Sequence, residues 1–276
     1  MKLRIATCSV LPEFDADAAP LAAALVGAGI PHELLAWDDP GASWDEPGAT
    51  VLRSTWNYVQ DVTAFLAWLE RVAAAGPVWN PLAIVRGNVH KRYLLELARR
   101  GVPVVPTTVV EQGFAIDLPR ERCVIKPEVG AGSSGTRAFD ANDPAAIAHC
   151  ATLTARGAAL IQPYIASIDG YGERSLVWID GELSHAIRKA PRFAGQDESV
   201  TGPFPIASDE RDVALAALAP IASELLYARV DLARDDHGNP MVMELELVEP
   251  SLFFARHPPS VDRFVSALHR RLTTAP

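Results

Sequence analysis

The sequence predicts an α/β unit at the N-terminus, followed by a larger α+β part. Within the first 55 residues, three short apolar runs alternate with an alanine-rich helical stretch at 15–27, as in βαβ units on a parallel sheet. Later apolar runs come in pairs around turn residues, and the pair around Asp180-Gly181 is the clearest antiparallel hairpin. We therefore expect a small Rossmann-like domain over 1–86 and a second domain over 87–276.

Composition excludes several classes of protein. The chain has 276 residues, of which 49% are hydrophobic and 21% charged, as in ordinary globular proteins. A net charge of -9 argues against nucleic-acid and anionic-membrane partners. The three cysteines, Cys8, Cys123 and Cys150, have neither disulfide-framework nor zinc-site spacing. With no signal peptide and no apolar run of 18 residues, we expect a cytoplasmic protein, and a homodimer is left open.

The first domain is expected to contain strands at 3–8, 32–36 and 50–53. Its first turn, from Ser9 to Glu13, has no glycine, so the dinucleotide-binding fingerprint is absent. Polar residues follow the third strand, and ligands of open α/β sheets bind beyond the carboxyl ends of strands. Arg53 and Ser54 are therefore candidate substrate-binding residues, with an ordinary surface loop as the alternative.

Helices are expected at 63–75 and 89–100, the second with Asn88 as its N-cap and Gly101 as its end. Lys91 would then lie in the first turn, where a cation opposes the positive end of the helix. This unfavourable placement suggests that Lys91 binds a ligand, although a solvated surface lysine is the alternative.

A glycine-rich loop follows an expected strand at 123–127 that carries Lys126. The loop reads Gly-Ala-Gly-Ser-Ser-Gly over 130–135, but the next residues are typical of a strand and no lysine follows the last glycine. It therefore fits neither a Rossmann nor a Walker A loop. A glycine-rich hairpin can still place backbone N–H groups over phosphates, with Ser133 and Ser134 adding hydroxyl donors; a flexible surface turn is the alternative.

The middle of the chain adds further elements. Asp143-Pro144 is expected to open a helix that ends near residue 155, and a strand at 158–163 leads into Tyr164-Ile165 as a hinge. The hairpin at 172–189 ends on Arg188 and Lys189. We expect a mobile loop over 190–208, a helix over 209–226 and a last helix over 260–272.

Two late strands, at 227–233 and 241–248, carry an acidic cluster. Glu244 and Glu246 are two residues apart and share one face of the second strand, while Asp231 could lie across from them. Three such carboxylates would repel, and no basic residue lies between Asp235 and Ser251. An all-oxygen site of this kind favours Mg²⁺, or Mn²⁺; the alternative is the solvated face of an amphipathic strand.

The ordered set of motifs resembles the ATP-grasp superfamily, specifically its glutathione-synthetase-like carboxylate–amine ligases. The resemblance extends from Asn88 to His257 and rests on a lysine on a helix, Ile-Lys-Pro, the glycine-rich hairpin, Gln-Pro-Tyr-Ile, and the acidic pattern followed by Pro-Ser. It implies an ATP-grasp fold after a Rossmann-like domain, with a lid subdomain over about 106–165. The details RSTWNY, LSHAIRK and ELELVEPSLFF are similar to a bacterial subgroup that includes the O-ureido-serine cyclo-ligase.

The resemblance also implies a role for each candidate residue. Lys91 and Lys126 would contact the ATP phosphates. Other nucleotide contacts would come from the loop glycines and serines, the adenine-reading segment and a ribose-binding glutamate: Gly130, Gly132, Ser133, Ser134, Gly135, Gln162, Tyr164, Ile165 and Glu173. The metal ligands would be Asp231, Glu244 and Glu246. Arg188 and Lys189 would stabilise the transferring phosphoryl group, and Ser251 would join Arg53 and Ser54 at the substrate.

These expectations add up to a ligase that uses ATP and Mg²⁺. A small amino-acid-like carboxylate would be activated as an acyl phosphate and attacked by an amine, since positioning and charge neutralisation are what phosphoryl transfer requires of a protein. An intramolecular cyclo-ligase, a kinase that releases the acyl phosphate, and a nucleotide-binding regulatory protein without activity remain alternatives.

Overall fold

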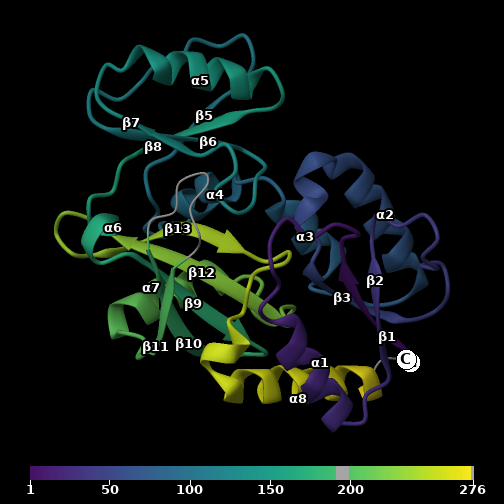
Figure 1. Cartoon of the computed structure of the whole chain (residues 1–276). Helices are drawn as coiled ribbons and strands as arrows, with labels where there is room; N and C mark the ends of the chain where they lie inside the picture. Colours follow the sequence, from purple (N-terminus) through teal and green to yellow (C-terminus); the bar gives the residue numbers. More distant parts are fainter. Residues whose placement is uncertain (191–198, 275–276) are drawn as a thin grey trace.

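The computed structural model describes residues 1–190 and 199–274, whose strands form three sheets (Figure 1). The N-terminal sheet is parallel, with strand order β2-β1-β3-β4. The central sheet, β11-β10-β9-β12-β13, and the small sheet, β5-β8-β6-β7, are antiparallel. The α/β unit followed by an α+β part is confirmed. No helix in the described ranges is long and apolar enough to cross a membrane.

The N-terminal sheet lies between two layers of helices. Its region contains β1 (Leu3–Thr7), α1 (Ala18–Gly27), β2 (His32–Ala36), β3 (Ala49–Ser54), η1 (Trp56–Gln60), α2 (Val62–Ala75), β4 (Val78–Trp79) and α3 (Leu82–Asn88). One face buries Phe65 and Leu69 of α2. The other face packs on α1 and on the C-terminal helix α8 (Pro258–Thr274), which lie side by side in Figure 1. The chain therefore returns at its end to complete the core of its first domain.

The small sheet stands above the central sheet and carries a helix on its outer face (Figure 1). It follows α4 (Tyr93–Arg99) and is built from β5 (Thr108–Val110), β6 (Cys123–Pro127), β7 (Arg137–Phe139), α5 (Pro144–Thr154) and β8 (Ala159–Pro163). Asp143 caps α5 as predicted, accepting from the backbone N–H of Ala145 at 2.8 Å. Its core, which includes Ile125, Phe139 and Ile161, is separate from the others.

The central sheet supplies most of the charged side chains discussed below. It and its neighbours comprise α6 (Ser167–Gly170), β9 (Glu173–Ile179), β10 (Glu182–Lys189), β11 (Val200–Phe204), α7 (Ser208–Leu218), β12 (Tyr227–Arg234), β13 (Pro240–Glu246) and η2 (Phe254–Arg256). Asp180 and Gly181 both have positive φ, 43° and 95°, which confirms the predicted tight hairpin turn. Leucines of α4 and α7 pack with Leu176, Val230 and Val242 of the sheet.

Asn88 does not cap a helix, because α3 ends at this residue and the next helix starts at Tyr93. Its buried side-chain amide donates to the carbonyl of Leu245 at 2.8 Å and accepts from the N–H of Leu247, also at 2.8 Å. Strand β13 is an edge strand whose backbone groups need partners, and Asn88 supplies them. The predicted helix over 89–100 is thus shortened, and Lys91 precedes it.

Two predictions for the later chain were also wrong in extent. The helix expected over 209–226 ends at Leu218, because Pro220 lacks an N–H group and restricts the residue before it. The mobile loop expected over 190–208 contains β11, which pairs with β10 from Lys189↔Val200 to Ala186↔Phe204. The part of that loop at 191–198 lies outside the described residues.

Candidate active site

A cavity of about 480 Å³ lies where the three sheets meet. The small sheet contributes Lys126 and Gln162, the central sheet contributes Arg229 and Glu246, and η1 of the N-terminal region contributes Trp56. Its volume is in the range of small-molecule and cofactor pockets. Most of the residues that we predicted from separate stretches of sequence therefore face one space.

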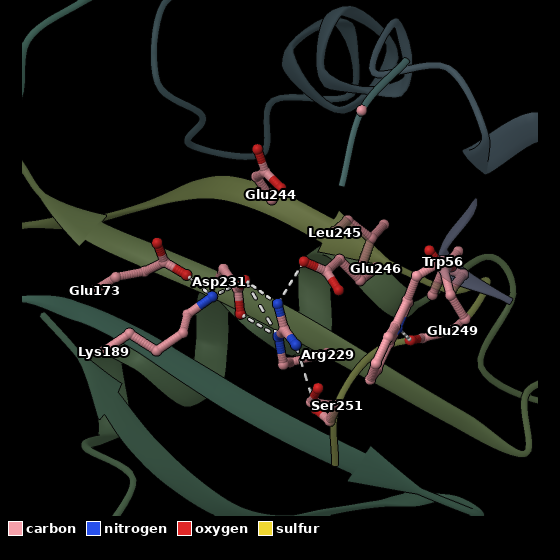
Figure 2. A network of polar contacts seen from close by, with 12 residues as sticks. Trp56, Glu173, Lys189, Arg229, Asp231, Glu244, Leu245, Glu246, Glu249 and Ser251 are labelled. Atoms are coloured by element: carbon pink, nitrogen blue, oxygen red, sulfur yellow. Dashed lines mark hydrogen bonds and ion pairs between the residues drawn. The ribbon is translucent and has the colours of Figure 1, made fainter. Parts of the chain in front are cut away.

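The floor of the cavity carries a row of alternating charges across four strands (Figure 2). The Lys189 ammonium pairs with Glu173 on the neighbouring strand and lies 3.0 Å from the Oδ2 atom of Asp231. The Arg229 guanidinium binds both carboxylate oxygens of Asp231 at 2.9 Å and also pairs with Glu246. The order Glu173, Lys189, Asp231, Arg229, Glu246 thus alternates acidic and basic side chains.

This alternation determines which groups are ionised. Burial alone would raise the pKa of Asp231, but Arg229 and Lys189 outweigh it and hold the pKa well below its usual range. Burial and Arg229 would lower the pKa of Lys189, yet the carboxylates of Asp231 and Glu173 keep it above normal. Burial raises the pKa of Glu173 to about 8. Lys189 and Arg229 therefore stay positively charged beside a cavity that could receive an anion.

A second cluster lies above the first, where Glu244 points away from the row toward the small sheet (Figure 2). The Lys126 ammonium lies 2.8 Å from one carboxylate oxygen of Glu244, and the Lys91 ammonium lies 3.8 Å from the other. Burial would raise the pKa of Glu244, but Lys126 and Lys91 lower it to about 2. Lys91 also donates to the carbonyl of Gly130 at 2.8 Å. Both predicted lysines thus converge on one acid from different elements.

The predicted metal ligands are not gathered as one group. Among the described residues, no cluster of three His, Cys, Asp or Glu side chains is arranged to hold a metal ion. Asp231 does lie opposite Glu244 in the strand register, but it is only 1% exposed and outside the described lining of the cavity. The sequence argument that a metal cation must balance these carboxylates did not take into account four basic side chains, which are those of Lys91, Lys126, Lys189 and Arg229. Glu244 and Glu246, which line the cavity with carboxylate oxygens, fit a magnesium ion best.

The prediction for Arg188 needs correction. Adjacent residues of a strand point to opposite faces, so the residue next to Lys189 cannot share its environment. Arg188 is exposed, its guanidinium lies 5.7 Å from the ring centroid of Phe204, and it is not among the described residues that line the cavity. Arg229 lines the cavity where Arg188 was expected. Its signal in the sequence was the two-residue spacing from Asp231, which puts both on one face of β12.

The neighbouring pair Arg188 and Lys189 allows a direct test. We expect Lys189→Ala to lower kcat by about 10²- to 10³-fold, because it removes a cation beside the cavity. Arg188→Ala, the matched control, is expected to stay within about twofold of the parent, as exposed substitutions usually do. Steady-state rates of ADP release measure both. Equal losses in the two variants would show that the face of β10 on which a side chain lies does not determine its contribution to kcat.

The glycine-rich loop lines the cavity through Gly130, Gly132, Ser133 and Ser134, whereas Gly135 lies outside the described lining. Gly132 and Ser133 have positive φ of 58° and 59°, so the turn carries one non-glycine residue in the left-handed region. At Gly135, a β-carbon would come within 3.3 Å of the Pro127 ring, and φ is +71°. Gly135 therefore shapes the turn, while the residues before it face the cavity.

The segment predicted to read adenine also lies at the cavity. Gln162, Tyr164 and Ile165 all line it, and the Gln162 amide donates to the Thr107 hydroxyl at 2.8 Å. The guanidinium of Arg122 lies 3.8 Å from the centroid of the Tyr164 ring. This segment joins β8 of the small sheet to α6, so it is well placed for a base that extends from phosphates near Lys126.

Arg53 and Ser54 do not reach the cavity, which corrects two of the three substrate predictions. Arg53 is 4% exposed, pairs with Asp17 at 3.2 Å and lies over the ring of Tyr227 at 5.5 Å. Ser54 shares a 2.9 Å hydrogen bond with the Thr7 hydroxyl. Arg53 thus packs the first domain against Tyr227 of β12, while Ser54 joins two strands within the first domain. Ser251, the third predicted residue, does line the cavity.

Other residues of the same segments line the cavity where Arg53 and Ser54 were expected. Trp56 and Tyr58 of η1 line the cavity, and the indole N–H of Trp56 donates to the backbone carbonyl of Glu249 at 3.1 Å. Glu249 also lines the cavity, and burial, followed by the charge of Glu246, raises its pKa to about 8. Glu249 was missed, although its position two residues before Ser251 was a usable signal.

Comparisons with known proteins agree with this arrangement. A family model described as the N-terminal domain of D-cycloserine synthetase DcsG matches residues 3–80. The cycloserine biosynthesis protein DcsG of Streptomyces lavendulae is 37% identical over an alignment of 295 positions, which covers 98% of each chain. The crystal structure of D-cycloserine synthetase DcsG superposes with a TM-score of 0.89 at 35% identity, covering 99% of this chain and 100% of that one.

More distant structures share the fold. D-alanine–D-alanine ligase from Bacillus anthracis, solved in complex with ATP, has a TM-score of 0.69 at 16% identity and is covered over 99% of both chains. The ATP-grasp ligase PsnB, solved with its minimal precursor, Mg and ADP, has a TM-score of 0.62 at 18% identity and 96% coverage of both chains. At these identities the likeness concerns the fold, which is that of ATP-grasp ligases.

Proposed function

The chain belongs to the ATP-grasp ligases that include D-cycloserine synthetase DcsG, and from that membership we propose that it closes a ring within one amino-acid-like molecule. The general activity is that of an ATP-dependent carboxylate–amine ligase, which forms a C–N bond. The proposed specific reaction is of the O-ureido-serine type, in which the attacking nitrogen and the activated carboxyl belong to the same substrate. An intermolecular ligation is the alternative.

The observation that supports the proposal best is the convergence of four cations on one cavity. Lys91 and Lys126 approach Glu244 from above, while Lys189 and Arg229 lie in the charge row below. A triphosphate is the kind of ligand that such a set can neutralise from two sides. The nearby loop at 130–135 offers backbone N–H groups for the same phosphates.

We assign the nucleotide and its metal to this chain as follows. ATP would lie between the small and central sheets, with its base near Gln162, Tyr164 and Ile165 and its ribose near Glu173. Glu244 and Glu246 would hold Mg²⁺, which neutralises phosphate charge when bound; Mn²⁺ is an alternative ion. Asp231 remains a proposed ligand that would have to loosen its pairing with Arg229 or Lys189.

The side chains then support two chemical steps. In the first, a carboxylate oxygen of the substrate attacks the γ-phosphorus, the bond to the bridging oxygen breaks, and ADP leaves. Lys189 and Arg229 stabilise the charge on the transferring group. In the second, the substrate nitrogen attacks the acyl carbon and inorganic phosphate leaves. Because water hydrolyses acyl phosphates, the burial of the cavity floor protects the intermediate.

The remaining expectations are part of this proposal. We propose a cytoplasmic enzyme, with a domain boundary near residue 86 and a lid over about 106–165 that moves above the central sheet during turnover. We further propose that its partners are small molecules and not nucleic acids or membranes. A homodimer would be recognised by light scattering of the purified protein.

The decisive experiment offers O-ureido-D-serine and its L-enantiomer to the purified protein with ATP and Mg²⁺. We expect ADP release with one enantiomer and a cyclised product by mass spectrometry, without any added amine. ADP release only with an added amine would replace the proposal by an intermolecular ligase. Hydroxylamine trapping of an acyl phosphate without amide would indicate a kinase, and ATP binding without turnover would indicate a regulatory protein.

A further inference from the structure

Glu249 is a buried acid on the cavity wall that has no cationic partner in the part of the chain that the structure describes. Its side chain is 8% exposed and lines the cavity, yet it forms no ion pair with any described residue. Four other acids in or beside the cavity do: Glu173 and Asp231 pair with Lys189, Glu246 with Arg229, and Glu244 with Lys126. Of these five acids, Glu249 is the one without an ion pair among the described residues.

The position of Glu249 separates it from the phosphate-binding side. It lies just beyond the end of β13, beside Trp56, on the far side of Glu246 from Asp231 and Lys189 (Figure 2). The indole of Trp56 holds its backbone carbonyl at 3.1 Å, so the residue is fixed to the loop that follows β3. Ligands of parallel α/β sheets bind at the carboxyl ends of strands, and Trp56 lies at such an end.

Ionising this buried acid without a counter-ion is costly, in keeping with its raised pKa, and a ligand that brings a positive charge removes that cost. Mg²⁺ would lie near Glu244 and Glu246, and a nucleotide is an anion, so neither supplies the charge at this end of the cavity. We propose that Glu249 binds the ammonium group of the substrate and so selects amino acids over simple carboxylic acids. Arg229, which belongs to the charge row, would bind the reacting carboxyl group of the same substrate.

This inference rests on the proposed function and names a subsite within it. The test compares O-ureido-D-serine with 3-(ureidooxy)propanoate, which has the same carboxylate and nucleophile but no ammonium group. In the Glu249→Gln variant we expect KM for the amino compound to rise about 30-fold or more, since a buried charge pair loses one partner. The KM for ATP, and kcat/KM for 3-(ureidooxy)propanoate, are expected to stay within about threefold of the parent values.

Two variants control for a merely structural effect. Glu249→Asp keeps the charge and should recover part of the preference for the amino compound. Glu224→Gln changes an exposed acid in the turn after α7 and should match the parent enzyme in every constant. If Glu249→Gln lowered kcat/KM equally for both compounds, or left the preference for the amino compound intact, the ammonium subsite would be overturned.

Calorimetric binding of both compounds, with a non-hydrolysable ATP analogue present, separates this claim from the proposed function. Binding of the amino compound that Glu249→Gln weakens, without ring closure by the parent enzyme, would overturn the cyclo-ligase proposal and support the subsite. Ring closure that is insensitive to Glu249→Gln would do the opposite. If neither compound bound to the parent protein, both proposals would be overturned.

Discussion

Replacing Arg229 with methionine is expected to lower kcat for ADP release by about three orders of magnitude, because the cation that pairs with Asp231 and Glu246 also faces the cavity. Among the described residues, the same change leaves Lys189 as the one ion-pair partner of Asp231 and leaves Glu246 without one. Removing one partner of a buried charge pair costs about 3–5 kcal/mol, so the free energy of unfolding should fall by a similar amount. Steady-state kinetics and urea unfolding measure the two effects separately.

The conservative variant Arg229→Lys tells charge from geometry. A lysine keeps the positive charge but cannot bind both oxygens of Asp231 and reach Glu246 at once. We expect it to restore most of the stability and only part of the rate. Arg188→Met, which changes an exposed residue of β10, serves as the control. An Arg229→Met enzyme with normal kcat would exclude the guanidinium from the reaction.

The second large effect is expected for Glu244→Gln. Loss of this carboxylate should reduce magnesium-dependent turnover by about a hundredfold or more and raise the concentration of Mg²⁺ needed, since even indirect metal partners contribute 10- to 100-fold. Without metal, the variant should be slightly less stable than the parent, by about 1 kcal/mol, because Lys126 and Lys91 lose their shared carboxylate. Repulsion among acids alone would predict the opposite sign.

Acid pH offers an independent check on Glu244. Its pKa is lowered to about 2 in the folded protein by Lys126 and Lys91 against the effect of burial. Its pairing therefore contributes stability above the unfolded pKa, near 4.5, and that contribution is lost as the pH falls toward 2. The stability difference between parent and Glu244→Gln should shrink over this window. Glu121→Gln, an exposed substitution, provides the baseline. A rate and a pH profile equal to the parent's would remove Glu244 from the site.

Local patterns were sufficient for most elements and for much of the cavity wall. The hairpin around Asp180-Gly181 and the cap at Asp143 depend on a few neighbouring residues, so their sequence signals were reliable. Lys91, Lys126 and Lys189 line the cavity as expected. Asn88 misled the prediction, because its amide serves the edge of β13, some 157 residues away in sequence.

The partners of the charged residues could not be derived in the same way. Arg53 resembles a ligand-binding residue when only its neighbours in sequence are considered, yet Asp17 and three aromatic rings of later segments surround it. Asp231 was expected to need a metal because its own hairpin carries no nearby compensating base after Asp235. Lys189, from another hairpin, and Arg229, two residues before it, supply that charge.

The order of most elements could be read from the sequence, because it follows from local periodicity and turn chemistry. The resemblance of the motifs to ATP-grasp ligases indicated the type of ligase and most residues around the cavity. The three-dimensional arrangement was needed to show which acids are neutralised internally, that Arg229 lies where Arg188 was expected, and that Glu249 has no ion pair among the described residues. The physical reason is that ionisation and ion pairing depend on distances of a few ångströms between strands that are far apart along the chain.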